Sequence, residues 1–180
     1  MNERVFNGAF DRLRQTDRLE RLEVDKVVKL LTINRNIKSA IDIGTGTAVF
    51  AEAFCKKGFE VSAIDLNPEM IEEAKKYAPD VTYKVAPAEN IPFEDKSFDL
   101  VFMGLVFHEV DSYEKALNEA KRVGKQVIGI LEWDYVLEEV GPPIEHRIDP
   151  EIIKDLYQKL QFHSFEKVNL NTLVLYILEV

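Results

Sequence analysis

The chain has 180 residues, of which 46% are hydrophobic and 31% charged, a balance typical of one folded domain with a sizeable core. Lys and Arg number 23 against 32 Asp and Glu, so the formal net charge is −9, which excludes nucleic acid and anionic membranes as default partners. A single cysteine, Cys55, excludes an intrachain disulfide and a thiolate metal cluster. Its apolar helical surroundings favour a buried, inert thiol over a reactive one. We find no signal core and no stretch long enough to span a membrane, and therefore expect a cytoplasmic protein.

The N-terminal part of the chain carries the weakest pattern. Residues 1–16 have Phe6 and Phe10 as their apolar points and predict either a flexible lead or a flap. Leucines and valines in residues 17–31 fall near one helical face, which predicts a helix with Asp17 as its N-cap. We therefore expect one domain over residues 1–180, in which residues 1–35 form an N-terminal flap and a helix.

The rest of the chain alternates between strand-like and helix-like segments. Strands are expected at 39–43, 59–65, 81–85, 97–103 and 125–133, and helices at 47–58, 67–78, 112–123 and from 149 onward. Residues 165–180 predict a closing antiparallel hairpin that turns at 169–172. Such alternation predicts βαβ crossovers and a mostly parallel sheet covered on both faces, with ligands bound beyond the carboxyl ends of the strands.

A glycine turn, GTG at residues 44–46, follows the first of these strands. Glycine at 44 and 46 permits unusual backbone angles and lets a ligand approach the main chain closely. Asp65 ends the next strand about twenty residues later, where a carboxylate can accept hydrogen bonds from both ribose hydroxyls. The turn and the acid together favour an adenosine-containing cofactor. The alternatives are a tight turn without a ligand and a surface acid at 65, although Asn67 already supplies the helix cap.

Two residues distinguish between adenosine cofactors. A dinucleotide fingerprint needs a small residue at its third glycine position, where this chain has the branched Val49. Asp42 places a negative charge before the turn, which disfavours pyrophosphate and favours a sulfonium or ammonium group. The residues therefore favour S-adenosylmethionine over NAD. Asp42 can also be a buried acid that accepts hydrogen bonds from its own turn, and the two roles are compatible.

Three segments in order, IDIGTGTAVFAEAF, AIDLNPEMIEEAKK and APAENIPFEDKSFDLVFMGLVFHEVDSYEKALNEAKRV, resemble the class I S-adenosylmethionine-dependent methyltransferases over about residues 36–131. The similarity is to the small-molecule branch that includes ubiquinone-biosynthesis and arsenite methyltransferases. It implies an α/β, Rossmann-like three-layer sandwich with a seven-stranded, mostly parallel sheet whose last strand is antiparallel. It also implies S-adenosylmethionine as cofactor, and as its binding residues Asp42, Gly44, Thr45, Gly46, Asp65, Leu66, Ala88, Glu89, Met103 and Gly104.

Two positions depart from the family pattern. The third glycine of the first motif is Ala48 here, a small change that a helix N-terminus should tolerate. The adenine loop of relatives commonly reads D-A-E-x-x-P-F, whereas this chain has Pro87 in place of the aspartate. Because proline offers neither a polar side chain nor an amide donor, adenine recognition would rest on the Ala88 amide and on nearby acceptors such as Glu89.

Four residues are candidates for the acceptor side. Related methyltransferases often have histidine at the position of His108, whose unperturbed pKa also suits a general base, and packing between loop and helix is the alternative. The resemblance extends to a tail motif that points to Trp133, His146 and Arg147 as substrate contacts. Core packing is the alternative for Trp133, and a structural ion pair for Arg147. No metal site is expected.

We therefore expect methyl transfer from S-adenosylmethionine to an unidentified small-molecule acceptor. A lone Cys55 argues against arsenite as that acceptor, because arsenite methyltransferases hold arsenic with several thiols. There are two alternatives. The first is a protein that binds S-adenosylmethionine or S-adenosylhomocysteine without turnover, and the second, less favoured, is an NAD-dependent Rossmann enzyme.

Overall fold

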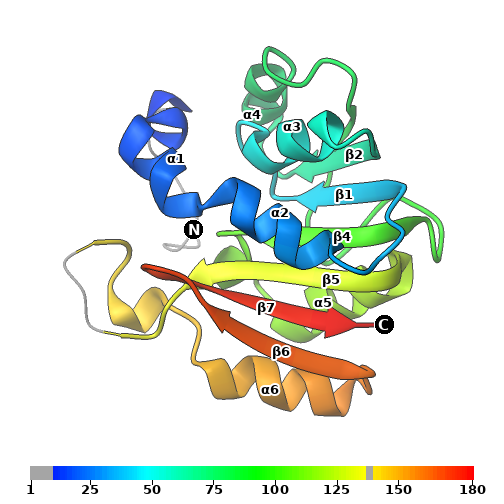
Figure 1. Ribbon diagram of the computed structural model, residues 1–180, viewed down its shortest axis with the longest axis vertical. Helices are drawn as coiled ribbons and strands as arrows, with labels where there is room; N and C mark the ends of the chain where they lie inside the picture. Colours follow the sequence, from blue (N-terminus) through cyan, green and yellow to red (C-terminus); the bar gives the residue numbers. More distant parts are fainter. Residues whose placement is uncertain (1–9, 137–139) are drawn as a thin grey trace.

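One seven-stranded sheet runs through the computed structural model, which describes residues 10–136 and 140–180. Its strand order is β3-β2-β1-β4-β5-β7-β6, and β7 alone runs antiparallel to its neighbours (Figure 1). The strands are β1 (Ser39–Ile43), β2 (Glu60–Asp65), β3 (Thr82–Val85), β4 (Phe98–Gly104), β5 (Gly124–Trp133), β6 (Ser164–Asn169) and β7 (Leu173–Glu179). The expected sheet, including the closing hairpin and the antiparallel last strand, is thereby confirmed.

Helices cover both faces of this sheet and complete the three layers. On one face, α2 (Val24–Thr32), α3 (Val49–Lys56) and α4 (Pro68–Ala74) contribute to an apolar cluster that includes Phe54 and Phe102. On the other face, α5 (Tyr113–Val123) and α6 (Pro150–Lys159) contribute to a second cluster around Ile41, Ile128 and Leu117. Short 3₁₀ segments are η1 (Phe10–Arg14), η2 (Phe107–Glu109) and η3 (Ile144–His146). The sheet strands are apolar on both sides because both sides are covered.

Local signals determine where several helices begin. The side chain of Asn67 accepts a hydrogen bond from the amide of Glu69 at 2.9 Å, and Pro68 occupies the first helical position of α4. Asp149 accepts from the amide of Glu151 at 3.0 Å and begins α6 in the same way. The expected cap at Asn67 is therefore present as a hydrogen bond, and the helix expected from residue 149 begins with a cap of the same kind.

The expected continuous helix over residues 17–31 is wrong in one respect. It is two helices, α1 (Thr16–Leu22) and α2, separated by Glu23 in a left-handed conformation with φ 44°. The residue before α1 is Gln15 rather than Asp17, and it makes no side-chain cap. Oxygens of Glu23 accept from the amide of Asn171 at 3.0 Å, a long-range contact, and from Lys26 at 3.0 Å, a local one, and both stabilise the break. As a result, α1 lies beyond the carboxyl ends of the parallel strands (Figure 1).

Three smaller expectations can be compared with the structure. Helix α4 ends at Ala74, earlier than the expected 78, and is followed by turns. Phe6 lies outside the described residues, while Phe10 begins η1. Cys55 is half-buried in α3, and burial raises the pKa of its thiol, in agreement with an inert side chain.

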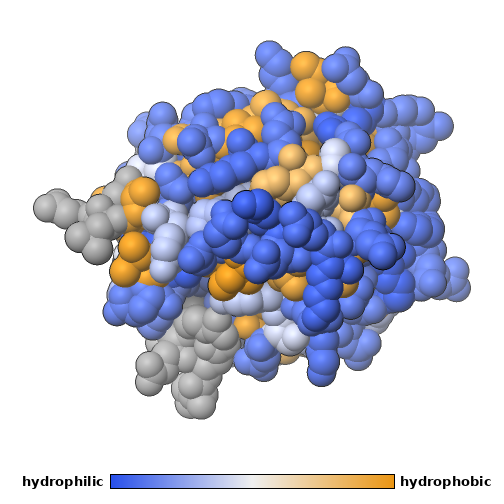
Figure 2. Space-filling view, turned by 90° about the horizontal axis from the view of Figure 1, so that it is seen from below, coloured by the Kyte–Doolittle hydropathy of each residue, from blue (hydrophilic) through white to orange (hydrophobic). Residues whose placement is uncertain are grey.

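Seen from below, the described residues present no extended apolar surface (Figure 2). Hydrophilic residues dominate that face, and hydrophobic ones form small separate groups (Figure 2). None of the helices in the described part of the chain is long and apolar enough to cross a bilayer.

Candidate functional site

A cavity of about 1100 Å³ lies at the carboxyl ends of β1, β2, β4 and β5. This is where parallel α/β sheets bind their ligands. Eleven of the predicted site residues line it: Asp42, Gly44, Thr45, Gly46, Asp65, Leu66, Ala88, Glu89, Gly104, His108 and Trp133. Met103, His146 and Arg147 do not line it.

The glycine turn after β1 forms the floor of the cavity. Gly44 has φ 66°, and a Cβ placed there would meet Val106 at 2.3 Å, so only glycine fits between this turn and the segment after β4. Its amide and that of Thr45 donate to the carbonyl of Ile64 at 2.8 and 3.0 Å, which fixes the turn against β2. Ala48 has φ 62° directly before α3, a left-handed conformation in which alanine is strained.

Asp42 is buried beneath the turn and stabilises it from inside. One of its oxygens, Oδ2, accepts from the hydroxyl of Thr45 at 2.7 Å and from the amide of Ala51 at 3.2 Å. Burial raises the pKa of this carboxyl to about 7. At neutral pH it therefore carries less negative charge than an exposed aspartate. Its contacts are with its own turn and with the first turn of α3, which agrees with the role of a buried acid considered above.

Asp65 ends β2 at the rim of the cavity with both oxygens oriented by backbone amides. Oδ2 accepts from Gly46 at 2.8 Å and Oδ1 from Asn67 at 2.9 Å. Burial raises the pKa of this carboxyl, while the two amides act against that rise. The next residue, Leu66, leaves 63% of its surface exposed on the cavity wall. A carboxylate with free lone pairs beside an exposed apolar side chain suits a ribose and the flat base attached to it.

The loop after β3 brings Pro87, Ala88 and Glu89 to the same wall. Glu89 Oε1 accepts from the amides of Asp111 at 2.8 Å and Ser112 at 3.2 Å, and so holds this loop to the start of α5. The carboxylate that was expected to reach adenine therefore already has backbone partners. Ala88 is buried, and its place in the lining leaves its amide as the expected base contact.

The other end of the cavity contains a histidine and glutamate pair. His108 Nδ1 lies 2.8 Å from Oε2 of Glu132, and the His108 amide donates to Oε1 of Glu132 at 3.1 Å. Both side chains are buried. Because a carboxylate oxygen accepts hydrogen bonds, this contact favours the tautomer with hydrogen on Nδ1. Nε2 in turn lies 3.8 Å from Oε1 of Glu109.

Glu132 is the residue that sequence reasoning missed. It lies in the apolar run of β5, one residue before Trp133, and is 1% exposed. An acid inside an otherwise apolar strand was the available signal, because buried charges are almost always paired.

Arg147 lies outside the cavity lining. It is buried, and its guanidinium donates to four carbonyls, those of Pro142 at 3.0 Å, Asp134 at 2.8 Å, Val136 at 3.0 Å and Val140 at 2.7 Å. These contacts are structural hydrogen bonds to backbone, and with the residues that the structure describes Arg147 forms no ion pair. They position the segment after β5, from which Gly141 approaches the ring of Trp133.

His146 and Met103 lie elsewhere. His146 ends η3 and is half-buried. Met103 is fully buried within β4 and belongs to the core cluster on the α5 face. Only the next residue, Gly104, reaches the cavity from that strand.

The N-terminal segment forms the remaining wall. Arg14 donates to the carbonyl of Thr47 at 2.7 and 3.1 Å and to Glu52 at 2.9 Å, which attaches η1 to the start of α3. Leu13 is thereby held near Gly46, and α1 adds Arg18 and Arg21 to the lining. The described part of residues 1–16, for which a flexible lead or a flap was expected, contains η1.

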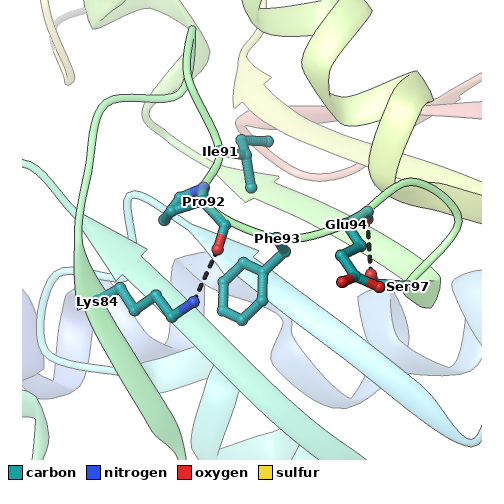
Figure 3. Close-up of a pocket in the computed structure, with 6 residues that line it drawn as sticks. All are labelled: Lys84, Ile91, Pro92, Phe93, Glu94 and Ser97. Carbon is teal, nitrogen blue, oxygen red and sulfur yellow. Dashed lines mark hydrogen bonds between the residues drawn. The ribbon is translucent and has the colours of Figure 1, made fainter.

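A second hollow, about 550 Å³, lies on the surface beside edge strand β3 and contains none of the predicted site residues (Figure 3). Its polar groups bind each other: Lys84 donates to the carbonyl of Pro92 at 2.7 Å, and the Ser97 hydroxyl to the carbonyl of Glu94 at 2.6 Å. In the described residues, no group of three or more His, Cys, Asp or Glu side chains could hold a metal ion.

Comparisons with known proteins agree with this geometry. Residues 41–127 match the model of a family described as a methyltransferase domain. Demethylmenaquinone methyltransferase of Renibacterium salmoninarum is 32% identical over 111 residues, which cover 62% of this chain and 45% of that protein. Ubiquinone/menaquinone biosynthesis C-methyltransferase of Rickettsia prowazekii is 33% identical over 160 residues, 82% of this chain and 58% of that protein. The chain thus spans about half the length of these relatives.

A solved structure is similar over nearly its whole length. The crystal structure of a SAM dependent methyltransferase from Aquifex aeolicus has a TM-score of 0.84 at 24% identity, and the match covers 95% of this chain and 96% of that one. The match confirms the fold, with its seven-stranded sheet and covering helices. Together with the sequence similarities, it shows that residues 41–127 are similar to a methyltransferase domain and that the chain has the fold of a SAM dependent methyltransferase.

Proposed function

We propose that this protein transfers a methyl group from S-adenosylmethionine to a small-molecule acceptor. The observation that carries the proposal is the pairing of two sites in one cavity. Asp65, oriented by Gly46, lies at one end, and His108, oriented by Glu132, lies at the other. The first site suits a ribose and the second suits a proton acceptor, so the cavity has the parts for both cofactor binding and turnover.

The residues present fit the cofactor. Gly44 and Gly46 leave the turn without side chains, and the nearest atom to a Cβ placed on Gly46 is 3.5 Å away, on Leu13. Asp65 would hold the ribose, Leu66 would pack on adenine, and Gly104 would lie against the methionine part. When bound, the sulfonium supplies an electrophilic methyl carbon.

The chain's own contribution is orientation and proton transfer. Holding an acceptor in line can supply roughly 7–11 kcal/mol of barrier lowering. The wall made by η1 and α1 would exclude water, and His108 Nε2 could accept a proton from an acceptor that arrives protonated. This oriented histidine favours an enzyme over a protein that only binds the cofactor.

The names of the relatives do not identify the methyl acceptor of this protein. Relatives named for demethylmenaquinone and for malonyl-[acyl-carrier protein] are similar to a comparable degree, at 32% and 29% identity. Their names therefore do not choose between acceptors. The net charge of −9 supports a small molecule over nucleic acid, and a cytoplasmic location is part of the proposal.

Calorimetry with S-adenosylmethionine, S-adenosylhomocysteine and NAD tests the proposal. We expect both sulfur compounds to bind and NAD to fail, and the reverse result would overturn the proposal. The change Asp65→Asn replaces one carboxylate oxygen with an amide nitrogen. Either a backbone amide or a hydroxyl of the bound ribose would then lose a charged acceptor. At about 1.5–3 kcal/mol per such bond, affinity should fall roughly 10- to 150-fold. Asp80→Asn, an exposed aspartate outside the cavity, is the matched control.

A further inference from the structure

The wall that α1 and η1 contribute to the cavity is rich in arginine. Residues 10–22 contain four arginines and no lysine, in a chain whose acids outnumber its bases. Three of the four, Arg12, Arg18 and Arg21, line the cavity. Arg18 and Arg21 are three residues apart on a helix, so they share a face, where like charges destabilise the helix. Stability alone does not account for this placement.

Few acidic groups in the described part of the chain neutralise the guanidinium groups of Arg18 and Arg21. Arg21 lies 3.8 Å from Asp17, whose side chain is 70% exposed, and Arg18 makes no hydrogen bond or ion pair with any part of the chain that the structure describes. By contrast, Arg14, Arg122 and Arg147 each donate several hydrogen bonds.

The charges around Arg18 point the same way. Burial lowers the pKa of this guanidinium, and its positive neighbours Arg21 and Arg12 lower it further, while Glu109 and Asp17 act in the opposite direction. The acidic groups near Arg18 therefore do not offset the effect of burial and of the two neighbouring arginines on its charged form. An anion bound here would restore that balance.

The arginines lie on the acceptor side of the cavity. Glu109, the strongest attractive charge on Arg18, is also 3.8 Å from Nε2 of His108. Arg21 lies 5.8 Å above the ring of Trp133, at the end of β5. Asp65 ends β2, which is separated from β5 by β1 and β4, so the ribose site is at the opposite end.

We infer that the methyl acceptor is an anion, whose carboxylate or phosphate group binds Arg18 and Arg21 while the atom to be methylated faces His108. The planar guanidinium fork suits both groups, since each presents paired oxygens. That the bound anion receives the methyl group rests on the proposed function, but anion binding itself can be tested without turnover.

The test is an NMR titration of the full chain, with and without saturating S-adenosylhomocysteine, that follows the side-chain Nε–H signals of Arg18 and Arg21. The probes are inorganic phosphate, benzoate and, as the neutral counterpart of benzoate, benzamide. We expect saturable shifts with phosphate or benzoate, and none with benzamide. A response to benzoate alone assigns a carboxylate, and a response to phosphate alone assigns a phosphate.

Three variants make the test specific. Arg18→Gln should weaken anion binding at least tenfold, and Arg21→Gln should do the same if the first variant folds poorly. Lys29→Gln removes one positive charge from an exposed position on α2 outside the cavity and should leave binding within twofold. If Lys29→Gln weakened anion binding as much as the arginine variants do, binding would depend on overall charge rather than on a site, and the inference would be overturned.

The outcomes separate this inference from the proposed function. If S-adenosylhomocysteine binds but neither anion shifts the arginine signals, the anion site is wrong and the cofactor site stands. If S-adenosylhomocysteine does not bind, the proposed function fails, and the titration without it still decides whether an anion site exists.

Discussion

Replacing Glu132 with glutamine should reverse the tautomer of His108 while keeping the shape of the site. In the native protein Glu132 accepts two hydrogen bonds, from the His108 amide at 3.1 Å and from Nδ1 at 2.8 Å. Glutamine has one oxygen and one amino group. Because the backbone amide can only donate, the glutamine oxygen must face it, and the amino group then faces Nδ1. Nδ1 becomes the acceptor, and the hydrogen moves to Nε2.

The size of the effect follows from the alternative arrangement. If glutamine turned its oxygen toward Nδ1, its amino group would face the His108 amide and leave a buried donor unpaired, which costs about 1–3 kcal/mol. The tautomer with hydrogen on Nδ1 should therefore be about 5- to 150-fold rarer in Glu132→Gln than the one with hydrogen on Nε2. If His108 is the general base, kcat should fall by a similar factor, with the affinity for S-adenosylhomocysteine unchanged.

Long-range ¹H–¹⁵N correlation spectra of the imidazole ring measure the tautomer directly and need no acceptor. We expect hydrogen on Nδ1 in the native protein and on Nε2 in Glu132→Gln. Glu109→Gln, which removes a carboxylate 3.8 Å from Nε2 without touching Nδ1, should retain the native tautomer. Finding hydrogen still on Nδ1 in Glu132→Gln would refute the assigned role of Glu132.

Three further changes test other parts of the site. Asp42, whose pKa burial raises to about 7 from 3.8, retains a proton in the folded state that the unfolded chain releases, so native stability falls as pH rises between these values. Between pH 4 and pH 7, the free energy of unfolding of the native protein should fall by at most about 4 kcal/mol relative to that of Asp42→Asn, as measured by urea denaturation. A difference that stays constant with pH would contradict the raised pKa of Asp42. Arg14→Gln should speed amide hydrogen exchange in residues 10–22 at least tenfold by removing charged bonds of about 1.5–3 kcal/mol, and unchanged rates would show that η1 is held by other contacts. Arg147→Met leaves four carbonyls without their donor and should lower the free energy of unfolding by about 3 kcal/mol or more, measured by thermal denaturation; a loss below 1 kcal/mol would show that water replaces the guanidinium.

The sequence by itself determined the features that depend on neighbours along the chain. The strands, the caps at Asn67 and Asp149, the glycine turn and the acid that ends β2 all follow from local periodicity and residue chemistry. The family resemblance supplied the strand count and the expected site. These signals act over a few residues or follow one another in a fixed order along the chain, so they can be identified without coordinates.

Only the tertiary structure decided how distant side chains pair. Glu132 contacts His108 across 24 positions of the sequence, and Glu89 contacts the start of α5 across 22, so neither partner could be assigned in advance. Arg147 had suitable chemistry for a ligand, yet its guanidinium is used by four backbone carbonyls. The break at Glu23, which accepts from the distant amide of Asn171, separates α2 from α1, the helix that adds Arg18 to the cavity lining. Long-range packing, rather than residue type, decides which charged groups remain available to a ligand.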